Sequence, residues 1–376
     1  MKGIAQARID LQAVRHNFAR VRTLAPDSKV LAVLKANAYG HGAVRVARAL
    51  VAADGFAVAR LEEALALRAA GIEHRIVLLG GVFDDASLAV AANARVEPVV
   101  HDIQQLKMLE RASLARPARV WLKLDTGMRR LGFEPDAAPS VFERLAASDA
   151  VADVAALMTH LACADDTASE MTVEQCKRFE AAARDLRVER SLANSAGIIA
   201  WKYTHAHWVR PGIMLYGASP ILGRTAAQDG LRPAMTLATQ LIAVRRARKG
   251  ERVGYGATHE CRRDTVIGTA AIGYGDGYPR HAPDGAPVLV NGRRAALAGR
   301  VSMDMVGIDL GPDGTARVGD PVTLWGEGLP IEEIASAAGT IAYELTCAVT
   351  ARVQVTVADD AANDERSASV GSARVG

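Results

Sequence analysis

The sequence lacks a strong charge bias, because its 376 residues carry 45 Lys and Arg against 42 Asp and Glu. So small an excess, with no basic stripe interleaved with aromatics, predicts neither nucleic-acid nor membrane-surface binding. No run of about 20 apolar residues offers a transmembrane span. Asp and Arg stand near the N-terminus where a signal peptide needs apolar residues, so we expect a cytoplasmic protein.

Cysteine is also scarce. The four cysteines are Cys163, Cys176, Cys261 and Cys347. None forms a CxxC pair, and none has metal-ligand spacing with a histidine. We therefore expect buried, reduced thiols and no metal site.

Apolar, strand-like runs recur through the first 230 or so residues. They lie at 29–35, 55–59, 75–79, 95–100, 118–124, 153–159, 189–193 and 206–210. Segments with helical periodicity lie between most of them, including 43–53, 61–70, 103–112, 138–147 and 170–186. Eight strand–helix units in roughly 200 residues predict an α/β fold, a (β/α)8 barrel of the TIM type. A doubly wound sheet is the alternative, but its GxGxxG fingerprint is missing after the first strand.

After about Leu231 the apolar runs become closely spaced, with Gly, Pro and Asp turns between them. They lie at 237–244, 265–272, 287–290, 295–301, 320–324 and 352–357. This pattern predicts a mostly-β C-terminal domain. We expect a barrel domain over 10–228, with a helix opened by Asp10, and a β domain over 229–360 that includes a strand in 1–9. Residues 361–376 have few bulky apolar residues, which predicts a disordered tail.

The segment VLKANAYGHG places Lys35 directly after a buried strand. Taken alone, such a lysine most often extends its amine out to solvent from the strand end. The alternative is an amine whose pKa desolvation lowers, so that it can form a Schiff base. The residues at the other strand ends bear on this choice.

Barrel enzymes place their sites at the carboxyl ends of the strands. Polar residues also lie at or just after the ends of the fifth to eighth predicted strands, namely Lys123, Asp125, Arg130, His160, Asn194, Ser195 and Arg210. Ser195, Gly212 and Ile213 follow the seventh and eighth strands, where barrels often bind phosphate. An amine on one side and a phosphate cradle on another would suit pyridoxal 5′-phosphate (PLP).

Eight motifs in order carry a resemblance to a known family. They are VLKANAYGHG, DTGMRRLG, THLACADD, ANSAG, VRPGIMLYG, VGYGATH, GYGDGYPR and GRVSMDM. Together they resemble alanine racemase, a PLP enzyme of fold type III, over residues 5 to 357. The first motif alone would also suit a basic amino-acid decarboxylase or a small PLP-carrying barrel protein. The resemblance implies interconversion of L- and D-alanine, which supplies D-alanine for peptidoglycan.

The resemblance implies two catalytic bases. Racemisation removes the Cα proton from one face and returns it on the other, so one base per face is the simplest arrangement. Lys35 would hold PLP as a Schiff base and supply one base, and Tyr255 would supply the other. In the family this tyrosine reaches the site from the other subunit, which implies a homodimer with shared sites. Lowering a phenol pKa from ~10 toward ~7 requires roughly 4 kcal/mol, which the cations near Tyr255 could supply.

The resemblance also implies the roles of the remaining site residues. The cofactor contacts are Lys35, Tyr39, His160, Ser195, Arg210, Gly212, Ile213 and Tyr343. The substrate contacts are Arg130, Met303 and Tyr255, and the entryway consists of Asp165, Arg280, Arg300 and Ile341. Arg210 would donate a hydrogen bond to the pyridine nitrogen without giving up its proton. Lys123 is either a carbamate that orients Arg130 or a plain lysine paired with Asp125, and both interpretations stay open.

Two other functions remain as alternatives. A racemase of broader specificity would act on serine or other larger amino acids, although the missing secretion signal argues mildly against it. A non-catalytic PLP-binding protein would resemble the barrel alone. The β domain that carries Tyr255 argues against this second alternative.

Overall fold

The computed structural model describes residues 4–358 and divides the chain into two compact units. One unit is residues 17–232, and the other joins the segment up to His16 to the chain from Pro233 onward. The predicted tail at 361–376 lies outside the described residues. The predicted domain limits, 10–228 and 229–360, stay predictions.

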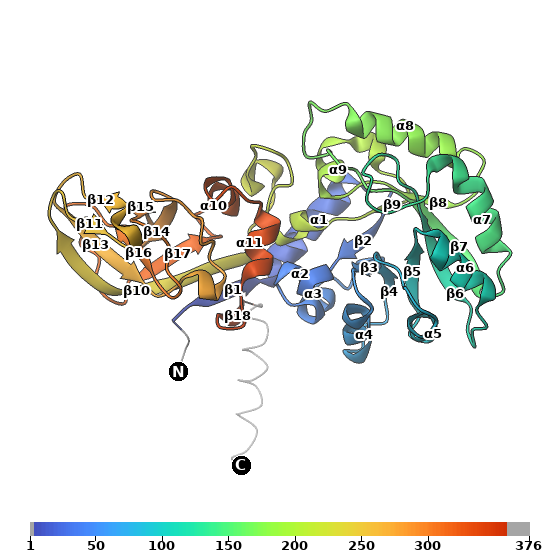
Figure 1. Ribbon diagram of the computed structural model, residues 1–376, viewed down its shortest axis with the longest axis horizontal. Helices are drawn as coiled ribbons and strands as arrows, with labels where there is room; N and C mark the ends of the chain where they lie inside the picture. Colours follow the sequence, from blue (N-terminus) through green and yellow to red (C-terminus); the bar gives the residue numbers. More distant parts are fainter. Residues whose placement is uncertain (1–3, 359–376) are drawn as a thin grey trace, which may run out of the picture. The chain divides into compact units, whose positions relative to one another are not determined.

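Parallel strands close into a barrel in the first unit (Figure 1). They are β2 (Lys29–Val33), β3 (Gly55–Val58), β4 (Arg75–Leu78), β5 (Val96–Val100), β6 (Ala118–Lys123), β7 (Val151–Met158), β8 (Glu189–Ser191) and β9 (Trp208–Val209). Each overlaps a predicted run, and β2 pairs with β9 to close the ring. The prediction of a (β/α)8 barrel is confirmed, and the doubly wound alternative is wrong.

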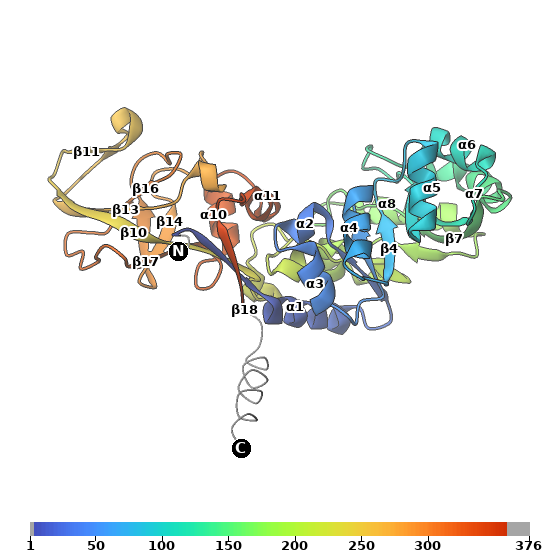
Figure 2. The same ribbon diagram turned by 90° about the horizontal axis from the view of Figure 1, so that it is seen from below.

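Helices cover the outside of the ring (Figure 1, Figure 2). They are α1 (Leu11–Leu24), α3 (Ala43–Ala49), α4 (Leu61–Ala69), α5 (Asp85–Asn93), α6 (Ile103–Arg111), α7 (Ala138–Ala146), α8 (Met171–Ala183) and α9 (Ser195–Ala200). Short side chains cap several of them, because the first amides of a helix have no partner within it. Asp10 accepts from the Ala13 amide at 3.0 Å, as the predicted helix start requires. None of the helices within residues 4–358 is long and apolar enough to cross a membrane.

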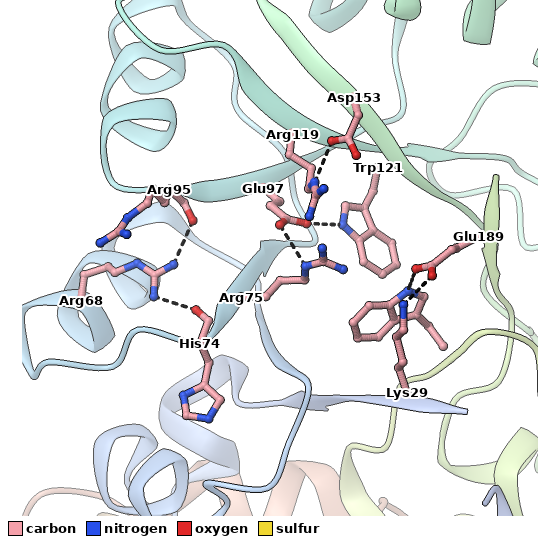
Figure 3. A network of polar contacts seen from close by, with 11 residues as sticks. Lys29, Arg68, His74, Arg75, Arg95, Glu97, Arg119, Trp121, Asp153 and Glu189 are labelled. Carbon is pink, nitrogen blue, oxygen red and sulfur yellow. Dashed lines mark hydrogen bonds and ion pairs between the residues drawn. The ribbon is translucent and has the colours of Figure 1, made fainter. Parts of the chain in front are cut away.

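A charged network fills the amino-terminal end of the barrel (Figure 3). Trp121 donates to Glu97 at 2.8 Å, and Arg75 pairs with the other oxygen of Glu97 at 3.0 Å. The Arg75 guanidinium also lies 4.9 Å from the ring centre of Trp208, within cation–π range. Burial raises the pKa of Glu97, against the pull of Arg75 and Trp121. These contacts join β4, β5, β6 and β9 at the end of the barrel opposite Lys35.

The second unit is built on one sheet, in the order β13-β16-β15-β14-β17-β10-β1-β18. Its strands are β1 (Gln6–Asp10), β10 (Met235–Ala247), β13 (Thr265–Ala270), β14 (Pro287–Val290), β15 (Arg293–Leu297), β16 (Val306–Asp309), β17 (Pro321–Trp325) and β18 (Gln354–Ala358). β1 runs antiparallel to β10 and parallel to β18. β11 (Arg252–Val253) and β12 (His259–Glu260) form a separate small hairpin. The prediction of a mostly-β domain is confirmed.

Two expectations need correction, one about this unit and one about the thiols. The sequence pattern gave no helix between 324 and 352, yet α10 (Ile331–Ala337) and α11 (Ala342–Ala348) lie there. Helices of seven residues span about two turns, which is too short for a clear period. The thiols were expected to be buried, but Cys347 in α11 is exposed and Cys163 is only partly buried.

Candidate active site

Lys35 opens a turn of unusual hand. The turn, α2 (Lys35–Tyr39), follows β2 directly. From Ala36 to Tyr39 the φ angles are 52°, 53°, 55° and 53°, which is left-handed helix. Each such residue costs about 1–2 kcal/mol when it carries a Cβ. A strained segment of this length persists only where its surroundings hold it, and such segments concentrate at functional sites.

An aromatic stack holds this turn. The Tyr39 ring lies 4.8 Å from that of Tyr216, and the His41 ring packs on the same tyrosine at 4.6 Å. Tyr216 donates its hydroxyl proton to the Val33 carbonyl at 2.7 Å, which ties the stack to β2. Burial lowers the pKa of His41 to about 4, so the ring is neutral and its Nδ1 donates to the Tyr39 carbonyl at 2.9 Å. The stack therefore holds the chain both before Lys35, at Val33, and after it, at Tyr39 and His41.

The residues predicted to bind phosphate, Ser195, Gly212 and Ile213, lie together after the ends of β8 and β9. Ser195, the first residue of α9, accepts from the Gly212 amide at 2.8 Å and the Met214 amide at 3.4 Å. Its own O–H then remains to donate. A Cβ at Gly212 would lie 2.6 Å from the Tyr39 hydroxyl, so only glycine fits there. Ile213 follows as the first residue of the 3-10 turn η3 (Ile213–Tyr216).

Arg210 is buried and is hydrogen-bonded through both terminal nitrogens of its guanidinium group. It donates to the Ser191 hydroxyl at 2.6 Å, the Thr159 carbonyl at 2.6 Å and the Leu192 carbonyl at 3.2 Å. Burial lowers the pKa of Arg210 to about 10, so it stays protonated at neutral pH. Its Nη2 lies 3.3 Å from His160 Nδ1, which must accept because arginine can only donate. Burial, then the nearby Arg210, holds the pKa of His160 well below its usual value, so His160 is neutral.

Lys123 ends β6 and faces the same cluster of cations. Its side chain is buried, and its pKa falls to about 8, first because of burial and then because of Arg210 and Arg130. Asp125 acts in the opposite direction and raises this pKa. Positive charge thus exceeds negative charge at these strand ends. Buried charges need a partner, so the site suits an anionic ligand.

Asp125 shapes the loop that carries Arg130. Its carboxylate accepts from the amides of Gly127 at 2.9 Å, Arg129 at 3.0 Å and Arg130 at 3.0 Å. Burial raises the pKa of Asp125, but these amides outweigh it and the net shift is downward. The exposed Arg130 lines a surface cavity of about 450 Å³ with Phe83. Asp125 therefore acts mainly on the backbone of this loop.

Gln175 in α8, which no sequence motif singled out, supports His160. Its side chain is fully buried. Its amide donates to the His160 carbonyl at 2.9 Å and to the Thr126 hydroxyl at 3.1 Å. Its oxygen accepts from the Ala162 amide at 2.8 Å. The only available signal was a glutamine on the buried face of the predicted helix, which does not reveal its partners.

The remaining predicted site residues lie in the second unit, except Asp165, whose carbonyl accepts from the Leu222 amide in the barrel unit. Tyr255 begins the turn η5 (Tyr255–Ala257) between β11 and β12, and 70% of it is exposed. It lines a cavity of about 430 Å³ with Arg300 and Met305. Tyr255 and the predicted entryway residue Arg300 are thus brought together.

The motifs GYGDGYPR and GRVSMDM pack on each other in this unit. The Gly275 amide donates to the Met303 carbonyl at 2.9 Å. Arg352 pairs with Asp304 at 2.6 Å and with Asp276 at 3.3 Å, and so links the two motifs. The other predicted residues of this unit are the exposed Arg280 and Ile341 and the half-buried Tyr343, which lies in α11.

The fold and the strand-end cluster define an α/β-barrel protein whose excess of positive charge at the strand ends suits an anionic ligand. Residues 9–220 match the family model described as alanine racemase, N-terminal domain, and residues 234–357 match alanine racemase, C-terminal domain. Similar proteins include an alanine racemase of Shewanella loihica, 52% identical over 94% of this chain and 99% of that protein. Another, from Nitrosococcus oceani, is 54% identical with the same coverage.

Solved structures agree. The biosynthetic alanine racemase from Pseudomonas aeruginosa has a TM-score of 0.92 and 49% identity, over 96% of this chain and 100% of that one. The alanine racemase from Acinetobacter baumannii has a TM-score of 0.89 and 37% identity, over 95% and 100%. The chain belongs to the alanine racemase family and is a racemase enzyme.

Proposed function

We propose that this enzyme interconverts L- and D-alanine with PLP bound at the strand ends of the barrel. The observation that carries the proposal is the position of Lys35. It stands at the end of β2 on a strained turn whose Tyr39 meets the cradle of Ser195 and Gly212. The cation cluster beside it supports an anionic cofactor.

The residues present fit PLP. Ser195, Tyr39 and the backbone at Gly212 and Ile213 would hold the phosphate, and Lys35 would hold the aldehyde carbon. Arg210 would donate to the ring nitrogen, because its pKa of about 10 keeps it protonated at neutral pH. When bound, PLP withdraws electrons from the amino-acid Cα and so weakens the Cα–H bond.

The chain's own residues would move the proton. Lys35 Nζ would take or return the Cα proton on one face, and the Tyr255 hydroxyl would do so on the other. The neutral His160 and the cationic Arg130 would stabilise the phenolate form of Tyr255. Tyr255 would come from a second copy of the chain, which makes the protein a homodimer with shared sites.

Substrate size would be set by the second unit. Tyr343 and Met303 would narrow the pocket, and Asp165, Arg280, Arg300 and Ile341 would line its entrance. A pocket narrowed by large side chains admits a methyl group and resists larger ones. The similarity to a racemase described as biosynthetic supports a role in supplying D-alanine for peptidoglycan.

The test is racemase activity on a panel of amino acids that includes alanine and serine. We expect conversion of either alanine enantiomer, a yellow protein, and strong loss of activity in Tyr255→Phe. Tyr203→Phe is the control, because Tyr203 is similarly exposed, at 58%, but lies outside the site. Comparable turnover of serine would support the broader racemase instead. A colourless protein without D-alanine production would refute the proposal.

A further inference from the structure

One carboxylate joins the Lys35 turn to the start of α4. Glu63 Oε1 accepts from the Ala36 amide at 2.6 Å. Its Oε2 accepts from the Ala59 amide at 2.8 Å and the Arg60 amide at 3.1 Å. Glu63 is partly buried and is the third residue of α4. It therefore connects the ends of two neighbouring barrel strands, β2 and β3.

Only one of these two contacts belongs to ordinary helix capping. A glutamate at the third helical position commonly reaches back to the amide at the helix start, as Oε2 does here. The bond from Oε1 instead goes to a residue 27 positions earlier in the chain. Capping needs a single acceptor oxygen, so the second contact requires another reason.

We propose that Glu63 is a positioning residue for Lys35. The peptide unit between Lys35 and Ala36 is planar, so holding the Ala36 N–H also fixes the rotation about the Lys35 Cα–C bond. Ala36 is also the first left-handed residue of the strained turn. At the far end of the turn the Ala38 amide donates to the Leu34 carbonyl at 2.7 Å. Glu63 thus aims the lysine from one side while the aromatic stack holds the turn from the other.

The inference rests on the proposed function only in that Lys35 is the residue that holds PLP. Glu63→Gln separates positioning from capping. Glutamine offers one acceptor oxygen, which can keep the bonds to Ala59 and Arg60. Its NH₂ group would then face the Ala36 N–H, donor against donor. Glu62→Gln is the matched control, because Glu62 is the exposed neighbour on the same helix.

Four measurements apply to wild type, both Gln variants and Glu63→Ala: PLP absorbance, steady-state kinetics, the thermal midpoint and amide hydrogen exchange. In Glu63→Gln we expect both PLP retention and kcat to fall by about 10- to 100-fold, the range for losing a hydrogen bond to a charged group. The visible absorbance of the bound cofactor measures PLP retention. The KM for alanine and the thermal midpoint of the cofactor-free protein should stay near those of wild type. Amide hydrogen exchange at Ala36 in cofactor-free protein should speed up in Glu63→Gln and not in Glu62→Gln. Glu63→Ala should show the same losses together with a lower thermal midpoint.

The outcomes are distinct. Wild-type protein that binds no PLP would refute the proposed function, and the positioning role with it. If wild type binds PLP but Glu63→Gln matches Glu62→Gln in retention, kcat and exchange at Ala36, only the positioning role is refuted. A lower thermal midpoint in Glu63→Gln without loss of PLP would also refute it, since Glu63 would then only cap α4.

Discussion

Lys123 is poorly suited to carry a positive charge where it lies. With a pKa of about 8 instead of 10.5, its neutral fraction at pH 7 rises from about 0.03% to about 10%. A neutral amine can add CO₂ and release a proton, which turns a cation into an anionic carbamate. That change would place negative charge beside Arg130 and Arg210. The balance of charge therefore favours the carbamate over the plain lysine.

We predict that protein equilibrated with ¹³C-bicarbonate shows a carbamate carbon by NMR at pH 8. The signal should weaken toward pH 6 at fixed dissolved CO₂, because below a pKa of about 8 the amine takes up a proton and loses its nucleophilic form. Lys123→Met should lack the signal. Retention of the signal in that variant, or its absence from wild type at pH 8, would favour the plain lysine.

Ser191 holds a buried charge in place. Its hydroxyl accepts from Arg210 Nη1 at 2.6 Å and donates to the Trp208 carbonyl at 3.0 Å. Ser191→Ala leaves one donor of a buried guanidinium unpaired, so we expect a loss of about 1–3 kcal/mol in the free energy of unfolding. Urea denaturation measures this. The control is Ser113→Ala, an exposed serine, which should change stability by less than about 0.5 kcal/mol.

The roles of Ser191, Gln175 and Glu63 could not be predicted from the sequence. Lys35, Arg210 and Ser195 could be found because they follow apolar runs, and a topology rule places such residues at one end of a barrel. Gln175 and Glu63 lie inside helices, where a polar residue is ordinary. Their partners come from distant segments, and no local pattern contains that information.

At the scale of elements, the left-handed turn is where local preference and the fold disagree. Residues 36–39 contain no glycine, so nothing in the sequence indicates a left-handed turn there. The turn takes the opposite hand because Tyr39 packs on Tyr216 and Glu63 holds Ala36. The barrel strands were predictable because there the local pattern and the fold agree. A continuous apolar run is the pattern of a parallel strand that is buried on both faces.

We predict that Ala36→Gly stabilises the protein by about 0.5–1 kcal/mol. Ala36 is exposed and has φ of 52°, so removing its Cβ relieves backbone strain without losing packing. Glycine's extra freedom in the unfolded chain offsets part of that gain. Ala66→Gly in the middle of α4, also exposed, should have the opposite sign, a loss of about 0.5–1 kcal/mol. Thermal denaturation of both variants would decide, and equal signs would contradict the prediction.

The contacts of Glu97, Arg75 and Trp121 at the amino-terminal end of the barrel should be coupled in their effect on stability. Glu97→Leu would leave Arg75 and the Trp121 N–H without their shared acceptor, so we expect a loss of about 3–5 kcal/mol. The double variant Glu97→Leu with Arg75→Leu should lose less, because it removes both charges together. Arg144→Ala is the control, since it breaks a partly exposed pair with Glu110 and should cost about 0–1 kcal/mol. Additive losses in a double-mutant cycle would contradict the coupling.

At the scale of the whole molecule, the two units hold different halves of the predicted site. Lys35, Arg210 and the phosphate cradle belong to the barrel, whereas Tyr255, Met303 and Arg300 belong to the second unit. Tyr255 and Met303 are large apolar side chains left 70% and 53% exposed. Such exposure of catalytic candidates is expected if a second copy covers them. The prediction of a homodimer rests on the resemblance alone, because nothing in composition or periodicity encodes oligomeric state.

A mixing experiment tests whether each site is shared between two copies. Lys35→Ala and Tyr255→Phe should each be nearly inactive alone. Co-expressed in equal amounts, half of the dimers carry one chain of each kind, and one of their two sites then has both an intact Lys35 and an intact Tyr255. About a quarter of wild-type activity should therefore return if sites are shared. If each site forms within one chain, every site keeps one defect and the mixture stays inactive. Co-expression of Lys35→Ala with Tyr203→Phe is the control, because there activity should return to about half under either arrangement.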